Sequence, residues 1–317
     1  MLKSGLPALA IIMITVGFGA PNSFAAPDRR IDDTAPVILK FPADFSLGGV
    51  TRIIEMDPRW DPRVKRSGIA RGTIRFPPGT KIRLEINYAC GQKPELLEHL
   101  GSEVVSIDAR DLDNFSDTTL SYIGKLSQLI EVKLDNTDAT DAGMKFLRPL
   151  KNLLIFTANR TLITGAAMSD IGKLSSLERL ELAGTRLNDA SMGKMEALTG
   201  IHLLVLTQSG IGDEGVSHLQ ALRNLERLWI NENPRITDKG LSYLVRLPHL
   251  HDLDLTGTGV TANSVKYLVQ CKSLKHLDLD FGKYSPTDMA KLHAALPGCS
   301  FRIHEPKLPT EIFSPLH

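Results

Sequence analysis

The sequence is short of the residues that mark several protein classes. It has only 3 cysteines among 317 residues, which excludes a small domain held together by many disulfides. Its 37 basic and 36 acidic side chains leave a net charge of +1, so bulk charge does not attract it to nucleic acid or to anionic lipid. With 42% hydrophobic and 23% charged residues, its composition is that of a globular protein, not of a disordered chain or a multi-span membrane protein.

One apolar run stands at the N-terminus. Lys3 precedes the run Leu6 to Ala20, and the small-x-small sequence Ser23-Phe24-Ala25 follows it. This order predicts a secretory signal peptide, residues 1–25, cut after Ala25. An uncleaved anchor is the alternative, although the run is shorter than the about 20 apolar residues that span a bilayer. We therefore expect a chain exported to the periplasm, the cell envelope or the extracellular space, with no integral membrane span after cleavage.

Beyond this segment the chain repeats with a period of 24 to 25 residues. Each copy opens with the pattern L-x-x-L-x-L, whose last two apolar positions are two residues apart and predict a short strand with one buried face. Apolar residues at i and i+3 later in the copy predict a short helix. About eight copies align, starting at Val104, Leu129, Leu153, Leu177, Ile201, Leu225, Leu250 and Leu274.

Two polar positions recur between the predicted strand and the predicted helix. The first is a turn residue whose side chain can satisfy the backbone groups of a buried bend. The second is a helix N-cap followed by an acidic residue that the helix dipole favours. The turn residues are Thr137, Thr161, Thr185, Ser209, Asn233 and Thr258, and the cap pairs include Thr140-Asp141, Asn188-Asp189 and Thr237-Asp238.

This unit resembles the leucine-rich repeat, in particular the T-D-x-G-L form of bacterial exported repeat proteins and, as the cysteine-containing subtype, of eukaryotic F-box receptors. The resemblance covers residues 99–303. It implies an α/β fold, a right-handed horseshoe-shaped solenoid with parallel strands on the concave side and helices outside, and it implies binding of other macromolecules. Gly165 and Ala262 depart from the pattern because they replace the aspartate after the cap.

The segments that flank the repeats differ from them. Residues 26–98 contain three stretches in which apolar residues alternate with polar ones or which end in turn residues. These stretches predict strands at Gly49 to Asp57, Gly68 to Phe76 and Lys81 to Ala89. We expect a small antiparallel β-cap that covers the first repeat, because an open solenoid end is an apolar face with an unpaired strand edge. Residues 304–317 form a Pro-containing tail.

No catalytic signature is present in the sequence. The metalloprotease, serine-hydrolase, Walker and kinase motifs and a C-x-x-C pair are all lacking, so we expect no enzyme, no cofactor and no metal. Cys271 falls in a column that leucine fills in other copies, and Cys299 precedes the last apolar pair, so both are interpreted as small core residues. A Cys271–Cys299 disulfide is the alternative in an oxidising compartment.

The residues beside the buried leucines are expected to point outward on the concave face and to stack at about 4.8 Å from strand to strand. Leu203, Val205 and Trp229 lie on adjacent predicted strands and predict one exposed apolar patch. Patches of this kind with a polar rim tend to bind partners, and tryptophan and arginine supply much of the binding energy. The alternative is a patch that a loop covers or that only stiffens the sheet. The predicted rim is Arg179, Glu181 and Arg227.

Acidic residues gather on the next two predicted strands. Asp252 and Asp254 lie on one strand, and His276 and Asp278 on its neighbour. Carboxylates this close repel one another, so a basic partner surface, a bound cation or solvent must compensate them. A flat strand surface rarely supplies the wrapped oxygen ligands that calcium prefers, and the solvated interpretation is favoured.

These observations predict an exported, non-catalytic module that binds another protein through its concave face. We expect a monomer that binds no nucleic acid. One alternative is a structural component of the cell envelope without a single ligand. The other is a substrate receptor of ubiquitin-dependent degradation similar to the F-box repeat proteins, which the export signal and the absence of a helical segment before the repeats disfavour.

Overall fold

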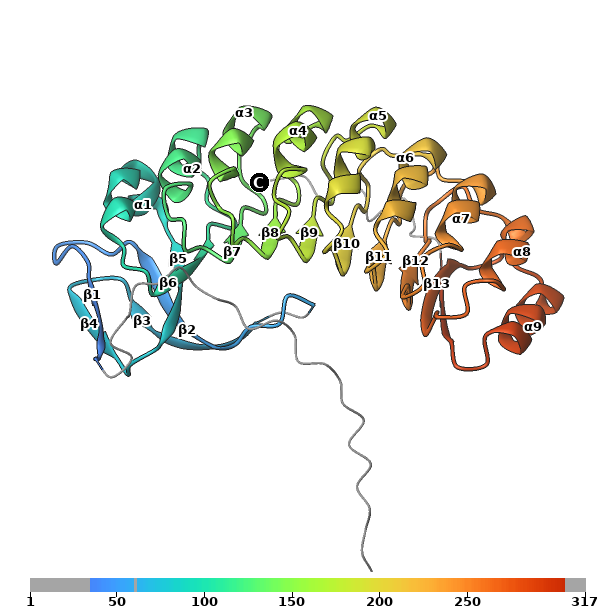
Figure 1. The fold of residues 1–317 in the computed structure, drawn as a ribbon, viewed down its shortest axis with the longest axis horizontal. Helices are drawn as coiled ribbons and strands as arrows, with labels where there is room; N and C mark the ends of the chain where they lie inside the picture. The colour runs from blue at the N-terminus through green and yellow to red at the C-terminus, as the bar shows by residue number, and fades with distance from the viewer. Residues whose placement is uncertain (1–34, 60–61, 306–317) are drawn as a thin grey trace, which may run out of the picture.

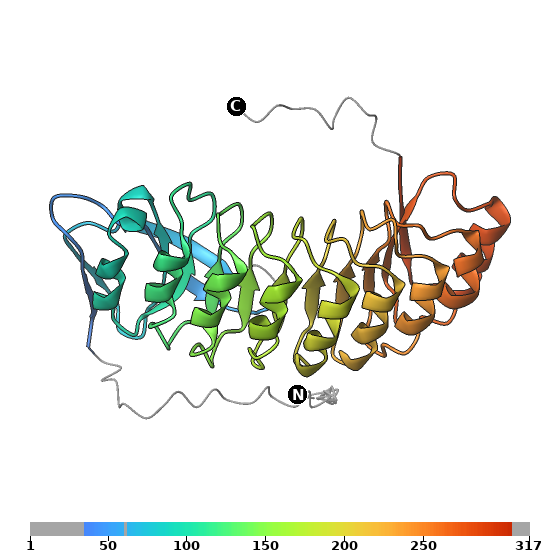
Figure 2. The same ribbon diagram turned by 90° about the horizontal axis from the view of Figure 1, so that it is seen from above.

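A computed structural model of the chain describes residues 35–59 and 62–305. These residues form a curved array, with strands along the concave side and helices along the convex side (Figure 1). Figure 2 views the same array from the helix side, where successive helices lie next to one another. The predicted signal peptide and its cleavage site, and residues 306–317 of the predicted tail, lie outside the described residues.

One parallel strand from each copy builds the sheet of the array. The strands pair in parallel with their sequence neighbours from β6 to β14, which confirms the α/β solenoid and its repeat register. They are β6 (Val104–Asp108), β7 (Glu131–Lys133), β8 (Ile155–Thr157), β9 (Arg179–Glu181), β10 (Leu203–Val205), β11 (Arg227–Trp229), β12 (Asp252–Asp254), β13 (His276–Asp280) and β14 (Ser300–His304).

Short helical segments return the chain along the convex side. Most are a single turn of α-helix or of 3₁₀-helix (η), and α9 is the longest described. They are α2 (Asp117–Ile123), α3 (Asp141–Met144), η2 (Lys145–Leu147), η3 (Gly165–Ala167), α4 (Met168–Ile171), α5 (Asp189–Met192), η4 (Gly193–Ala197), α6 (Asp213–His218), η5 (Leu219–Ala221), α7 (Asp238–Leu244), η6 (Ala262–Ser264), α8 (Val265–Leu268) and α9 (Pro286–Ala295).

Between strands and helices, leucines in register fill the interior. Leu180, Leu204 and Leu228 occupy the same position in three successive copies, and each has no exposed surface. Burial of one such side chain stabilises the fold by roughly 1.5 to 3 kcal/mol relative to exposure. Since each copy contacts mainly its neighbours, the core is a continuous column along the array.

The predicted turn residues bond to the backbone as expected. Thr137 Oγ1 donates to the carbonyl oxygen of Leu134 at 2.6 Å, and Asn233 Nδ2 donates to that of Ile230 at 3.0 Å. The residue before each one has positive φ, where glycine suits the backbone best. Glycine stands there at 184 and 257, whereas Arg160, Gln208 and Glu232 adopt φ of 51 to 56°. The hydrogen bond of the turn residue therefore holds a strained backbone conformation at the residue before it in several copies. The same bond three residues back is made by Thr161, Thr185, Ser209 and Thr258.

The aspartate after each cap contacts the next copy. Asp213 accepts hydrogen bonds from the backbone N–H of Thr237 at 2.7 Å and from its Oγ1 at 2.6 Å. The same threonine hydroxyl caps α7 by accepting from the N–H of Lys239. We call this contact the Thr–Asp bridge. It recurs between Asp117 and Thr140, between Asp141 and Thr164, and between Asp238 and Thr261. At Gly212, which has no hydroxyl group, only the backbone N–H donates to Asp189.

Two copies lack the aspartate, and the cap that follows each of them differs. After the copy with Gly165, Asn188 and Ser191 form a capping box within their own helix. After the copy with Ala262, Ser285 does the same with Asp288. These caps satisfy their backbone N–H groups locally and form no side-chain bridge to the preceding copy.

The residues before the repeats form strands that join the same sheet. β2 (Gly48–Glu55) pairs in antiparallel with β3 (Arg63–Ile69) and with β5 (Lys81–Ile86), and β5 pairs in parallel with β6. β1 (Val37–Lys40) and β4 (Thr73–Phe76) form a separate antiparallel pair. The sheet thus runs without a break from the β-cap into the array. The helical segments α1 (Tyr88–Gln92) and η1 (Pro94–His99) complete this region.

One of the three strands predicted there is wrong. The stretch from Gly68 to Phe76 is divided between β3 and β4 by a turn at Gly72, whose φ is +64°. The third predicted strand ends earlier than expected, because Asn87 caps α1 by accepting from the N–H of Cys90. Both differences follow from turn and cap chemistry, which ends a strand whatever its apolar pattern.

The cysteines carry free thiols, and no Cys271–Cys299 disulfide is formed. Cys271 is buried in the leucine column as predicted, and Cys299 is only partly buried. Burial raises the pKa of Cys271 to about 11 and that of Cys90 to about 12, which keeps both thiols protonated and unreactive at neutral pH.

We predict that Leu180→Ala lowers the free energy of unfolding by about 2 to 5 kcal/mol, because it removes a fully buried side chain and leaves a cavity. Leu162 is 57% exposed and is the matched control. Leu162→Ala should change the free energy by less than about 0.5 kcal/mol. Urea unfolding followed by circular dichroism measures both variants, and equal losses would contradict the core described here.

Candidate functional site

The predicted concave residues form two ladders across β9 to β13. One ladder holds Arg179, Leu203, Arg227, Asp252 and His276 at paired positions. The second ladder lies two residues further along each strand. Adjacency of the apolar residues on β10 and β11 is therefore as predicted. The second ladder consists of Glu181, Val205, Trp229, Asp254 and Asp278.

The predicted exposure of the apolar patch is wrong. Leu203 and Val205 are only 3% and 5% exposed, and Trp229 alone reaches 36%. Leu203 lies between Arg179 and Arg227, and Val205 lies beside Trp229. Strands about 4.8 Å apart on a concave surface bring these longer side chains over the shorter ones. A charge introduced at Leu203 would therefore test folding and not binding.

The predicted rim residues are engaged within the chain. Arg179 Nε donates to Glu181 Oε1 at 2.6 Å on the same strand, and Asn159 Nδ2 donates to Glu181 Oε2. Arg227 is buried, and burial followed by the charge of Arg179 lowers the pKa of its guanidinium. The patch is thus a packed surface of polar and apolar side chains, in which Trp229 is more exposed than Leu203, Val205 and Arg227.

Buried charged side chains occupy the N-terminal part of the concave face and form an ionic cluster there. Arg83 of β5 reaches across β6 and donates to Glu131 Oε2 of β7 at 2.6 Å through Nη2. Ser106 Oγ donates to the same oxygen at 2.5 Å, and Lys133 Nζ lies 3.5 Å from Glu131 Oε1. Glu131 has no exposed surface. Sequence analysis did not predict this cluster, because Arg83 comes from the β-cap and Glu131 from the second copy of the repeat.

The hairpin of the β-cap extends along the concave side (Figures 1 and 2). We call β2, β3 and the described residues between them the β2–β3 arm. Near its tip, Arg59 Nη2 donates to Asp57 Oδ2 at 3.0 Å. That hydrogen bond is the main cause that raises the pKa of Arg59, and the charges of Glu226 and Glu178 raise it further. The tip therefore lies near residues that immediately precede β9 and β11.

These residues form a further polar row. Glu226 accepts from His202 Nδ1 at 3.2 Å and lies 3.4 Å from His251 Nε2. Burial raises the pKa of Glu178, and the charge of His202 opposes that rise. The sequence contained these residues at one repeat position, and their alternation of acid and histidine was the signal that could have found the row.

Two of the acidic residues near the C-terminal end have counter-charges within the chain. Asp278 Oδ2 accepts from Arg302 Nη2 at 2.7 Å, and Asp278 Oδ1 lies 2.5 Å from His304 Nε2. Lys283 Nζ lies 2.7 Å from Asp280. The sequence hypothesis weighed a partner, a cation or solvent, and it missed β14 as the source of compensation. His276 is exposed, and Asp252 and Asp254 are half-buried.

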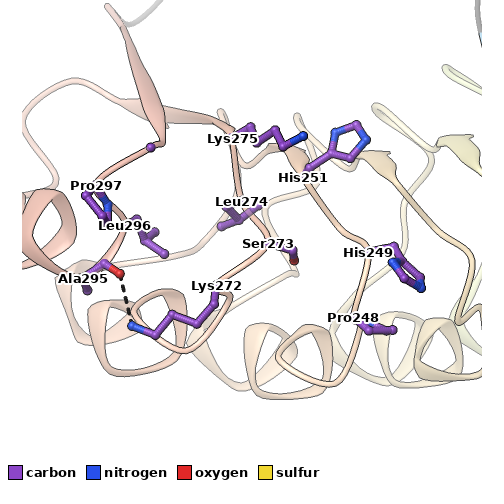
Figure 3. A pocket seen from close by; sticks show the side chains of 11 residues that line it. Pro248, His249, His251, Lys272, Ser273, Leu274, Lys275, Ala295, Leu296 and Pro297 are labelled. Atoms are coloured by element: carbon purple, nitrogen blue, oxygen red, sulfur yellow. Dashed lines mark hydrogen bonds between the residues drawn. The ribbon is translucent and has the colours of Figure 1, made fainter. Parts of the chain in front are cut away.

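A hollow of about 610 Å³ opens beside the N-terminal ends of β12 and β13 (Figure 3). Its polar side chains include His249, His251, Lys272 and Lys275, and Lys272 Nζ donates to the carbonyl oxygen of Ala295 at 3.1 Å. None of the predicted site residues lines it. Among residues 35–59 and 62–305, no group of three or more His, Cys, Asp or Glu side chains is placed to hold a metal ion.

The described helices are short, and the longest of them, α9, has 10 residues. In the described part of the chain, none has both the length and the apolar character that a bilayer-spanning helix needs.

Comparison with known proteins adds similarities of fold. No family model and no curated protein matches the sequence. Solved structures with a similar fold include an internalin of Listeria monocytogenes (20% identity, TM-score 0.43, 58% of this chain and 63% of that one), its internalin C2 (20%, 0.48, 70% and 86%) and a leucine-rich-repeat protein of Leptospira interrogans (19%, 0.49, 66% and 56%). The matches span less than two thirds of the first and third of these chains.

The repeat period, the parallel strand of each copy and the buried leucine columns decide the architecture. The fold is a leucine-rich-repeat solenoid. In this solenoid, the accessible part of the predicted concave site is its C-terminal half, around Trp229, Asp252, Asp254 and His276.

We predict that Glu131→Leu lowers the free energy of unfolding by about 3 to 5 kcal/mol, because it leaves buried Arg83 and Lys133 without their carboxylate partner. The double variant Arg83→Met/Glu131→Leu should lose less than the sum of the two single variants, since the pair is removed together. Urea unfolding of the four chains gives the coupling free energy. Additive losses would contradict a coupled buried pair.

The pKa of Asp254 predicts a pH dependence. Burial is the main cause that raises this pKa, and the charge of Asp278 adds to it. A raised carboxyl pKa gives stability that is present below about pH 4 and is lost as pH rises through the folded-state pKa. The free energy of unfolding of the native chain should therefore fall relative to Asp254→Asn as pH rises above about 4.

Asp288 is the control of opposite sign. Its hydrogen bond from Ser285 lowers its pKa, so the native chain should gain stability relative to Asp288→Asn as pH rises toward about 4. Urea unfolding at several pH values between 2 and 7 measures both pairs. The same sign for both residues would contradict these environments.

Proposed function

We propose that this chain is an exported, non-catalytic module that binds another protein on the concave face over β11 to β13. Trp229 is the observation that carries the proposal. It is 36% exposed on a strand whose inward neighbour Leu228 is fully buried. A rigid aromatic side chain held on a packed sheet can bury a large area against a partner at little cost in conformational entropy.

The surroundings of Trp229 support a polar rim. Asp254 is its paired neighbour on β12, and Asp252 and His276 lie along the other ladder. Asp252 Oδ1 is buried and accepts no hydrogen bond within the described residues. Because this oxygen is itself closed to solvent, a partner would reach this surface through Trp229 and the exposed His276.

The alternatives differ in what they require. A substrate receptor similar to the F-box proteins would need a helical adaptor segment before the repeats, whereas most of the region from Val37 to Ile86 consists of strands. A structural envelope component would need no saturable partner. Export rests on the N-terminal sequence signal, which lies outside the described residues.

We predict that Trp229→Ala weakens binding of the partner by about 2 kcal/mol or more, which is roughly 30-fold in Kd. The chain from Ala26 onward and its variant would be immobilised and exposed to envelope and secreted fractions of the source cells. Bound proteins would be identified, and each would then be titrated in purified form.

Phe281→Ala is the matched control, because Phe281 is an aromatic residue that is 62% exposed outside the two ladders. Saturable binding lost in Trp229→Ala and kept in Phe281→Ala supports the site. Equal binding by both variants overturns the site, and the absence of any saturable binding favours the structural alternative.

A further inference from the structure

Strand β3 ends the long sheet and has a free backbone edge. In the sheet order it follows β2 and pairs with β2 alone among the described residues. An unpaired edge presents N–H and C=O groups in alternation, which is a template for another extended chain. Proteins commonly shield such an edge, and β3 is seven residues long.

The side chains of β3 are open to solvent on both faces. Every residue from Arg63 to Ile69 is exposed except the half-buried Gly68. Val64 is 41% exposed and Ile69 is 56% exposed, and Ile54 of β2 adds 55%. Exposed large aliphatic side chains therefore gather on the β2–β3 arm, in contrast to the leucines of the array.

The charged residues of β3 are all basic, and none of them forms a buried ion pair within the described residues. Arg63 Nη1 lies 3.3 Å from Glu55 Oε2 with both side chains exposed. Lys65 and Arg66 form no ion pair within the described residues. Successive residues of a strand point to opposite faces, so Val64 and Arg66 share one face while Arg63 and Lys65 share the other.

We propose that β3 is a strand-addition site for an extended acidic segment of another protein. The added strand would pair its backbone with the free edge of β3. Its acidic residues would face Arg63 and Lys65 on one face of the sheet, and its apolar residues would cover Val64 on the other face. Strand addition takes its affinity from main-chain hydrogen bonds and its specificity from alternate side chains.

Two other interpretations of the same residues account for less. Charges on an edge strand can serve only to prevent aggregation, but Val64 and Ile69 would work against that role. Nucleic acid would match the basic residues but not the alternating backbone groups or the aliphatic side chains. The site lies on the β2–β3 arm and is independent of Trp229.

The test uses a labelled synthetic heptapeptide in which glutamate alternates with valine, titrated against the full chain by fluorescence anisotropy. We expect saturable binding. Arg63→Glu/Lys65→Glu should weaken it at least 10-fold, whereas Lys40→Glu/Arg75→Glu, the same charge change on the separate β1–β4 pair, should leave it within 2-fold. Thermal unfolding of both variants checks that they fold.

Peptide controls separate backbone pairing from charge alone. The same peptide with every backbone amide N-methylated keeps its charges but loses the donors of both edges, and it should not bind. Equal binding of the methylated peptide, or tighter binding of a single-stranded oligonucleotide of equal charge, overturns strand addition, as does the absence of binding by the unmodified peptide. Trp229→Ala should leave peptide binding unchanged, because Trp229 is not part of the β3 site. The outcome of this test and the outcome for the concave face are therefore independent of each other.

Discussion

The regular stacking of this solenoid depends on the Thr–Asp bridge between copies. One threonine, such as Thr237, both caps its own helix and donates to the aspartate of the preceding copy. The buried leucines supply most of the stabilisation, but the hydrophobic effect has no direction and does not fix spacing. The backbone ladder fixes the separation of the strands, and the paired hydrogen bond at Thr140, Thr164, Thr237 and Thr261 fixes the spacing on the helix side. The surface that the strands present follows from that separation.

Close strands on a concave face decide which side chains a partner can reach. Leu203, which pairs with arginines on both neighbouring strands, is only 3% exposed, whereas Trp229 is 36% exposed. Toward the N-terminus, the Arg83–Glu131 pair fills the same face. The accessible chemistry of the concave side therefore lies in its C-terminal half, while the β2–β3 arm offers a second surface of a different kind.

Local patterns were predictable from the sequence, and contacts between copies were not. The strand register and the bond of Thr137 to Leu134 involve a few neighbouring residues, and repetition over many copies reinforces them. The bridge role of the aspartates was missed because a cap and a dipole explained the same residue locally. The exposure of Leu203 depends on side chains 24 residues away on either side, and the compensation of Asp278 depends on Arg302 of β14. Such features require the packed arrangement of several copies.

The two capping boxes divide the array into blocks. In a repeat protein the free energy of folding is the sum of the terms of each copy and of each interface between copies. The interface after the copy of Gly165 and the one after the copy of Ala262 lack the bridge, so they are the weaker joints. We expect local opening to start at such joints and to separate cooperative foldons. Trp229 belongs to the middle foldon, and a ligand that binds this side chain therefore secures the centre of the solenoid before its ends.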